Sequence, residues 1–161
     1  MILFLHGLES GPHGSKYQAL QRRFGDVEAP DFRGLADIED RYTKLEALTK
    51  GETGLLLVGS SFGGLLAALM ADRCPERVAG YVLCAPAVQY DIAKKVTSTP
   101  EHAIILHGRE DTVIPMAASE DFSIKHKIPL LGVDDDHRLQ ASASLIVALT
   151  RYIKDEIIKS Q

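Results

Sequence analysis

The sequence predicts an α/β fold in which helices cover both faces of a parallel sheet of about six strands. Short apolar runs alternate along the chain with segments of helical periodicity, which is the pattern of βαβ units. Most of the runs lack polar positions, as expected for strands that are buried on both faces. The expected strands are Ile2–Leu5, Asp26–Ala29, Gly54–Val58, Gly80–Cys84, Ala103–Leu106 and Ile128–Gly132.

Four helices are expected between and after these strands. Three of them have apolar residues at spacings of three and four, and Asp37 is a good N-cap for the second. The remaining one is rich in Gly, Leu and Ala and is charged only near its end, which predicts a largely buried helix. The expected helices are Tyr17–Phe24, Ile38–Leu48, Phe62–Arg73 and, at the end of the chain, about Ala141–Lys159.

Length and composition indicate an ordinary globular protein. The 161 residues are expected to form a single domain, residues 1–161, with 45% apolar and 25% charged residues. The net charge of −4 and the lack of long Lys/Arg runs argue against nucleic acid and anionic membranes as partners. The N-terminus lacks the features of a signal peptide, and Cys74 and Cys84 lack metal-like spacing. We therefore expect a cytoplasmic protein with reduced thiols.

The strand Gly54–Val58 leads into Gly59-Ser60-Ser61-Phe62-Gly63, and a helix follows. A G-x-S-x-G sequence between a strand and a helix is typical of a nucleophile elbow, where a serine lies on a sharp, strained turn. Ser61 is centred between the glycines, so we expect Ser61 as the nucleophile and Ser60 as a structural residue. A chance Gly/Ser-rich turn is the alternative, and a phosphate loop is disfavoured because the lysine of that motif is missing.

Two later loops supply a candidate acid and a candidate base. Asp111 follows the strand Ala103–Leu106, and His137 follows the strand Ile128–Gly132. The carboxyl ends of parallel strands meet at one edge of a sheet, so both side chains are expected near Ser61. The chain order Ser, Asp, His is that of α/β-hydrolases. Glu110 is adjacent to Asp111 and equally charged, so it remains an alternative acid.

An oxyanion hole needs two backbone donors near the nucleophile. Phe62 N–H follows the serine directly, and Leu8 N–H follows a glycine at the end of the first strand, so we assign these two donors. His6 is expected to brace that loop.

Three carboxylates, Asp134 to Asp136, precede His137. Without the alternating ligands and the glycine of a calcium loop, this run is typical of a solvated turn. A further hypothesis is that its negative charge favours the protonated form of His137.

Taken together, these residues resemble the small, lidless bacterial esterases of the α/β-hydrolase superfamily, over nearly the whole chain. The similarity lies in Leu5–Pro12 with Lys16 following, in Gly59–Gly64, in His107–Pro115 and in Asp136–Leu139. The resemblance favours Asp111 over Glu110. It implies a minimal α/β-hydrolase fold without a cap domain, since the interval between Cys84 and Ala103 is too short for one.

The resemblance also implies acyl transfer to the serine and hydrolysis of the acyl-enzyme, with no metal or organic cofactor. We therefore expect a carboxylesterase-like serine hydrolase whose partner is a small-molecule acyl ester. An open site would favour small or solvent-exposed acyl groups. Thioester hydrolysis and acyl transfer use the same triad and remain alternatives, because the fold does not dictate the substrate. A ligand-binding or protein-binding module on the same scaffold is the competing hypothesis from another class.

Overall fold

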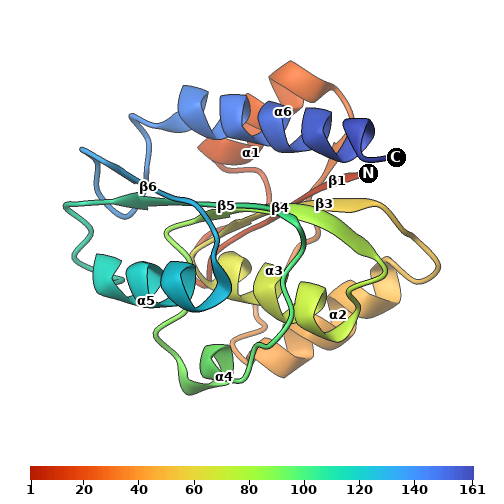
Figure 1. Cartoon of the computed structure of the whole chain (residues 1–161), viewed down its shortest axis with the longest axis horizontal. Helices are drawn as coiled ribbons and strands as arrows, with labels where there is room; N and C mark the ends of the chain where they lie inside the picture. The colour runs from red at the N-terminus through yellow and green to blue at the C-terminus, as the bar shows by residue number, and fades with distance from the viewer.

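A parallel sheet of six strands runs through the middle of the molecule, in the order β2-β1-β3-β4-β5-β6 (Figure 1). The computed structural model describes residues 1–161. All neighbouring strands pair in parallel, so the predicted sheet is confirmed. The strands are β1 Ile2–Leu5, β2 Val27–Glu28, β3 Leu55–Ser60, β4 Val78–Cys84, β5 His102–Gly108 and β6 Leu130–Val133.

Helices cover both faces of this sheet, as expected. In Figure 1, α1 and α6 lie above the sheet, and α2 to α5 lie below it. Successive residues of β1 point to opposite faces: Leu3 and Leu5 join a buried cluster of 26 residues, and Ile2 and Phe4 join another of 16. The helices are α1 Ser15–Phe24, α2 Ile38–Leu48, α3 Phe62–Arg73, α4 Asp91–Lys94, α5 Met116–His126 and α6 Ala143–Lys159.

Two helices were not predicted from the sequence, α4 and α5. The first is a single turn of four residues. The second buries only Ser119 and Phe122, so it has no apolar stripe that could indicate a helix. The predicted helices are present with ends shifted by at most two residues, and Asp37 caps α2 by accepting from Glu39 N–H at 2.7 Å.

The start of α3 is pressed against the sheet at two glycines. A Cβ atom on Gly63 would overlap the carbonyl group of Leu5, at the end of β1, and one on Gly59 would overlap the carbonyl oxygen of Gly63. The first ten residues of α3 are buried. The missing side chains therefore allow α3 to begin directly against the ends of β1 and β3.

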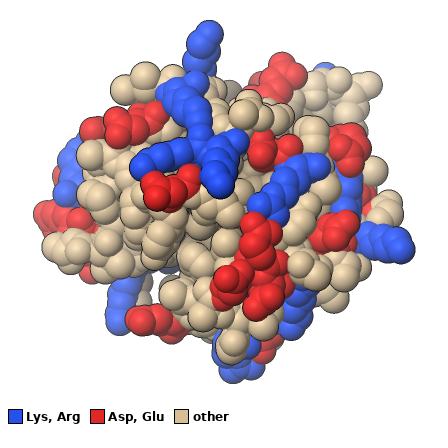
Figure 2. All heavy atoms as spheres, turned by 90° about the horizontal axis from the view of Figure 1, so that it is seen from below, with Lys and Arg blue, Asp and Glu red and all other residues tan.

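Charged side chains of both signs are interspersed over the face of the molecule seen in Figure 2, which looks onto the helices below the sheet. None of the six helices combines the length and the apolar character needed to cross a membrane.

Candidate active site

Ser61 occupies the turn between β3 and α3 in a strained conformation. Its φ is 54° and its ψ is −114°, where residues other than glycine are rare. The turn is held by the backbone: Ser61 N–H donates to Cys84 C=O at 2.9 Å, and Ser61 C=O accepts from Ala87 N–H at 2.9 Å. The side chain of Ser61 is thus fixed at the carboxyl edge of the sheet.

The structure brings the three predicted side chains into one hydrogen-bonded chain. His137 Nε2 lies 3.1 Å from Ser61 Oγ, and His137 Nδ1 lies 2.7 Å from Asp111 Oδ2. A carboxylate accepts hydrogen bonds only, so the neutral ring carries its proton on Nδ1. Nε2 is then free to accept the proton of Ser61 Oγ–H, which is the arrangement needed to activate a serine.

Asp111 is the acid that reaches the histidine. Its carboxylate is buried and accepts from Val113 N–H and Ile114 N–H, both at 2.8 Å, while Glu110 is exposed. Burial by itself raises the pKa of Asp111, but these backbone hydrogen bonds and the one to His137 outweigh it, and the pKa lies below its ordinary value. Asp111 therefore stays ionised beside the imidazole.

A second buried histidine lies against the same carboxylate. His107 Nε2 is 3.1 Å from Asp111 Oδ2 and 3.0 Å from the carbonyl oxygen of Ile114, so it must carry a proton toward these acceptors. His107 Nδ1 is 2.8 Å from Ser119 Oγ, which can then donate to it. The sequence did not predict these contacts of His107 with Asp111 and with Ser119 of α5.

The two backbone donors assigned from the sequence, Leu8 N–H and Phe62 N–H, belong to residues that line one cavity with Ser61 and His137. Neither N–H donates to another group of the protein. A Cβ atom on Gly7 would lie 3.5 Å from Ser61 Cβ, so the loop of residues 6–8 after β1, here called the β1 loop, passes beside the serine. His6 is buried and bonds within this loop, with Nδ1 2.7 Å from Gly7 O.

The carboxylates of the acidic run before His137 are bonded to residues other than His137. Asp134 pairs with Arg109, Asp135 accepts from Ser142 Oγ–H, and Asp136 accepts from Arg138 N–H. None of these contacts involves the His137 ring. No group of three His, Cys, Asp or Glu side chains in the molecule is arranged to hold a metal ion.

The cavity beside Ser61 has a volume of about 690 Å³, and only 7 of its 21 lining residues are hydrophobic. Three of the hydrophobic lining residues, Leu8, Tyr90 and Val113, are themselves exposed to solvent. The segment between β4 and β5 contributes only the single turn α4, so no cap domain is built over the site. The lining is therefore mixed, with polar side chains and exposed apolar side chains next to one another.

Comparison with known proteins agrees with this architecture. The family described as serine aminopeptidase, S33, matches residues 25–102, a range that includes Ser61 but ends before Asp111. No protein with a curated description matches the chain by sequence. Among solved structures, a hydrolase of the alpha/beta superfamily from Xanthomonas campestris pv. campestris is 25% identical, with a TM-score of 0.79 and 96% of each chain covered.

Two further structures share the fold at lower identity. Est1E from Butyrivibrio proteoclasticus is 18% identical with a TM-score of 0.76, and the match covers 98% of this chain and 88% of that one. Alpha/beta hydrolase domain-containing protein 10 from mouse is 19% identical with a TM-score of 0.75, covering 99% and 90%. The family match and these folds support a hydrolase. The chain belongs to the α/β-hydrolase superfamily.

Proposed function

We propose that the protein is a serine hydrolase that cleaves small acyl esters through Ser61, His137 and Asp111. The observation that carries the proposal is the hydrogen-bonded chain from Ser61 Oγ through His137 to Asp111, beside a cavity lined by two residues with free backbone N–H groups. A binding module needs neither this chain nor the strained serine, whereas nucleophilic catalysis needs both.

The first half of the reaction acylates the serine. Ser61 Oγ attacks the acyl carbonyl carbon while its proton passes to His137 Nε2, and Asp111 stabilises the resulting imidazolium. The carbonyl oxygen becomes an oxyanion that accepts from Leu8 N–H and Phe62 N–H. The tetrahedral intermediate collapses as the bond to the leaving alkoxide breaks, and His137 returns the proton to that alkoxide.

The second half releases the acid. His137 takes a proton from a water molecule, whose oxygen attacks the acyl carbon, and the bond to Ser61 Oγ breaks as His137 reprotonates the serine. In each half of the reaction, His137 therefore takes up one proton and gives it back.

The cavity favours a short acyl group. The site lacks a cap and its lining mixes polar and apolar side chains, so a long alkyl chain would leave much of its length in contact with water or polar groups. We expect kcat/KM for p-nitrophenyl esters to fall as the acyl chain grows from acetate to octanoate. An increase with chain length would contradict this substrate class.

The family match gives a specific second candidate, hydrolysis of an aminoacyl amide. The same triad supports it, because His137 can protonate a leaving amine. An aminoacyl p-nitroanilide beside the esters, and an acyl thioester of equal chain length, separates these substrates by kcat/KM. A higher value for the anilide would replace the ester proposal with an aminopeptidase.

Labelling with a fluorophosphonate tests the nucleophile directly. The native protein should bind one equivalent at Ser61, and Ser61→Ala should abolish labelling and lower kcat by about 10⁴-fold or more. Ser60→Ala is the matched control, because Ser60 directly precedes the nucleophile. This variant should leave labelling and kcat unchanged. A native protein that neither reacts with the probe nor turns over any ester would favour the binding module.

A further inference from the structure

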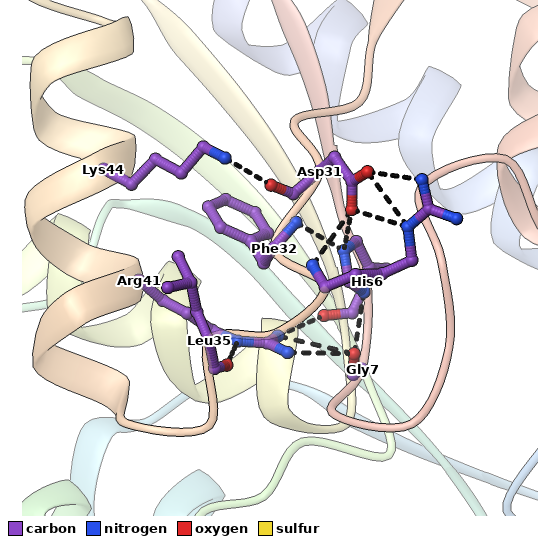
Figure 3. A network of polar contacts seen from close by, with 8 residues as sticks. His6, Gly7, Asp31, Phe32, Leu35, Arg41 and Lys44 are labelled. Carbon is purple, nitrogen blue, oxygen red and sulfur yellow. Dashed lines mark hydrogen bonds and ion pairs between the residues drawn. The ribbon is translucent and has the colours of Figure 1, made fainter.

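Arg41 is a buried cation without a carboxylate partner. It lies on α2 and its side chain is fully buried. The guanidinium donates only to carbonyl oxygens: Nε to Leu35 O at 2.7 Å, Nη1 to His6 O at 3.0 Å, and Nη1 and Nη2 to Gly7 O at 3.4 Å each (Figure 3). Burial lowers the pKa of Arg41, yet a guanidinium remains protonated in proteins. Burying a charge without an ion partner is costly. We therefore expect Arg41 to contribute to the structure or to the chemistry around it.

The carbonyl groups that Arg41 holds belong to the β1 loop. Gly7 C=O and Leu8 N–H are the two ends of one planar peptide group, so whatever fixes the carbonyl also fixes the direction of the N–H. Gly7 O accepts from Arg41 and from His6, and Leu8 lies on the cavity beside Ser61. The peptide is therefore held at its carbonyl end and free at its N–H end.

His6 completes this arrangement as a neutral ring. Phe32 N–H donates to His6 Nε2 at 2.8 Å, so the proton of the ring is on Nδ1, which donates to Gly7 O. Burial lowers the pKa of His6, and the charge of Arg41 acts in the same direction. In Figure 3 the imidazole and the guanidinium approach the same carbonyl oxygen.

The same guanidinium also contacts the residue that bears the other free N–H. Its Cζ atom lies 5.0 Å from the centre of the Phe62 ring and 5.5 Å from that of Phe32. Donors on the carbonyl end of a peptide polarise the group and strengthen its N–H as a donor. A fixed positive charge behind that peptide also favours negative charge in front of it, most strongly in a site that excludes water.

We propose that Arg41 is a positioning residue for the oxyanion hole, which directs Leu8 N–H into the cavity and supplies positive charge behind it. This inference rests on the proposed function, because it assigns Arg41 a role only if an oxyanion forms at Ser61. A purely structural Arg41 would join α2 to β1 and affect stability alone.

The test compares Arg41→Met and Arg41→Lys with Arg73→Met. Arg73 is the matched control because it joins α3 to Glu39 of α2 by a bidentate ion pair, far along α3 from Ser61. Each variant is assayed for kcat and KM with p-nitrophenyl acetate, and its folding is checked by thermal unfolding. The inhibition constant of a trifluoromethyl ketone is measured as well, because Ser61 Oγ adds to that carbonyl and leaves a stable oxyanion.

We expect Arg41→Met to lower kcat about 10²-fold, near the loss of one oxyanion donor, with KM changed by less than about threefold. The inhibition constant of the ketone should rise by a similar factor. Arg41→Lys keeps the charge but not the planar fork, so it should lose about tenfold in kcat and serves as the test if Arg41→Met does not fold. Arg73→Met should lower the unfolding temperature and leave kcat unchanged.

Two results would overturn the inference: a folded Arg41 variant with kcat within twofold of the native protein, or a lower kcat without weaker binding of the ketone. In either case labelling of Ser61 by fluorophosphonate in the native protein would leave the proposed function standing. A native protein that is neither labelled nor active would instead overturn the proposed function, and this inference with it.

Discussion

The two sides of Ser61 hold buried charges of opposite sign. On the side of β5 and β6, the Asp111 carboxylate is surrounded by N–H donors from the backbone and from two histidines. On the side of β1 and α2, the Arg41 guanidinium is surrounded by carbonyl oxygens and aromatic rings. Each buried charge is satisfied by fixed dipoles instead of a mobile surface ion.

The difference in sign matches the charges that the proposed reaction creates. Positive charge would develop on His137, beside Asp111, and negative charge would develop on the substrate oxygen, on the side of Arg41. Fixed groups that already point at developing charges need no rearrangement during the reaction, and this preorganisation is a major source of catalytic power. The comparison therefore predicts unequal consequences for changes on the two sides.

Removing the negative charge should have the largest effect. Asp111→Asn keeps the size of the side chain but cannot hold the protonated ring of His137 in place, so kcat should fall by about 10⁴-fold. Steady-state kinetics with p-nitrophenyl acetate measures the loss. Glu110→Gln, at the adjacent exposed position, should leave kcat unchanged, and a larger loss there would assign the acid to Glu110.

Crowding the contact between the start of α3 and the end of β1 should lower stability. In Gly63→Ala the new methyl group would overlap the Leu5 carbonyl, which should lower the free energy of unfolding by about 3 kcal/mol or more. Denaturant unfolding measures this change. Gly7→Ala is the control, because its Cβ atom would meet neighbours no closer than 3.4 Å and should cost less than about 1 kcal/mol. A loss in Gly63→Ala as small as the loss in Gly7→Ala would show that β1 can shift away from α3.

The charge of Asp111 should also be visible in the dependence of stability on pH. Its pKa in the folded protein lies below the ordinary value of about 3.9, so its contribution is present above that value and is lost as pH falls through the folded pKa. Relative to Asp111→Asn, the native protein should therefore lose unfolding free energy on acidification below pH of about 4. A difference between the two proteins that is constant down to acid unfolding would contradict the depressed pKa.

The smallest effect concerns the thiol of Cys84, the last residue of β4. The backbone of Cys84 holds Ser61, and burial raises the pKa of the Cys84 thiol to about 12. A disulfide reagent at pH 8 should leave Cys84 unmodified in the native protein, since the thiolate is the reactive form. Thiol counting on Cys74→Ser before and after unfolding checks this. Modification of the folded variant would mean that water reaches the sheet below Ser61.

Local pattern was enough to indicate the side of Asp111 and the β1 loop, but it did not indicate Arg41. The motif around Ser61 and the two loops after β5 and β6 depend on strand ends, which short apolar runs locate well. Arg41 lies within an apolar stripe that includes Ile38, Tyr42 and Leu45, where an arginine is usually taken for an exposed interruption. Its direction depends on carbonyl groups from the β1 loop and on the backbone at Leu35, which are distant in sequence or irregular in structure.

The packing of Gly63 against Leu5 has a consequence for how this protein can change. The relative position of Ser61 and the β1 loop is set by backbone against backbone, with no side chain between them. The exposed side chains around the cavity, such as Leu8, Tyr90 and Val113, take no part in that contact. In the proposed reaction, substitutions at those positions would therefore alter which molecule is accepted without moving the reacting atoms, which would make the site well suited to directed evolution toward new substrates.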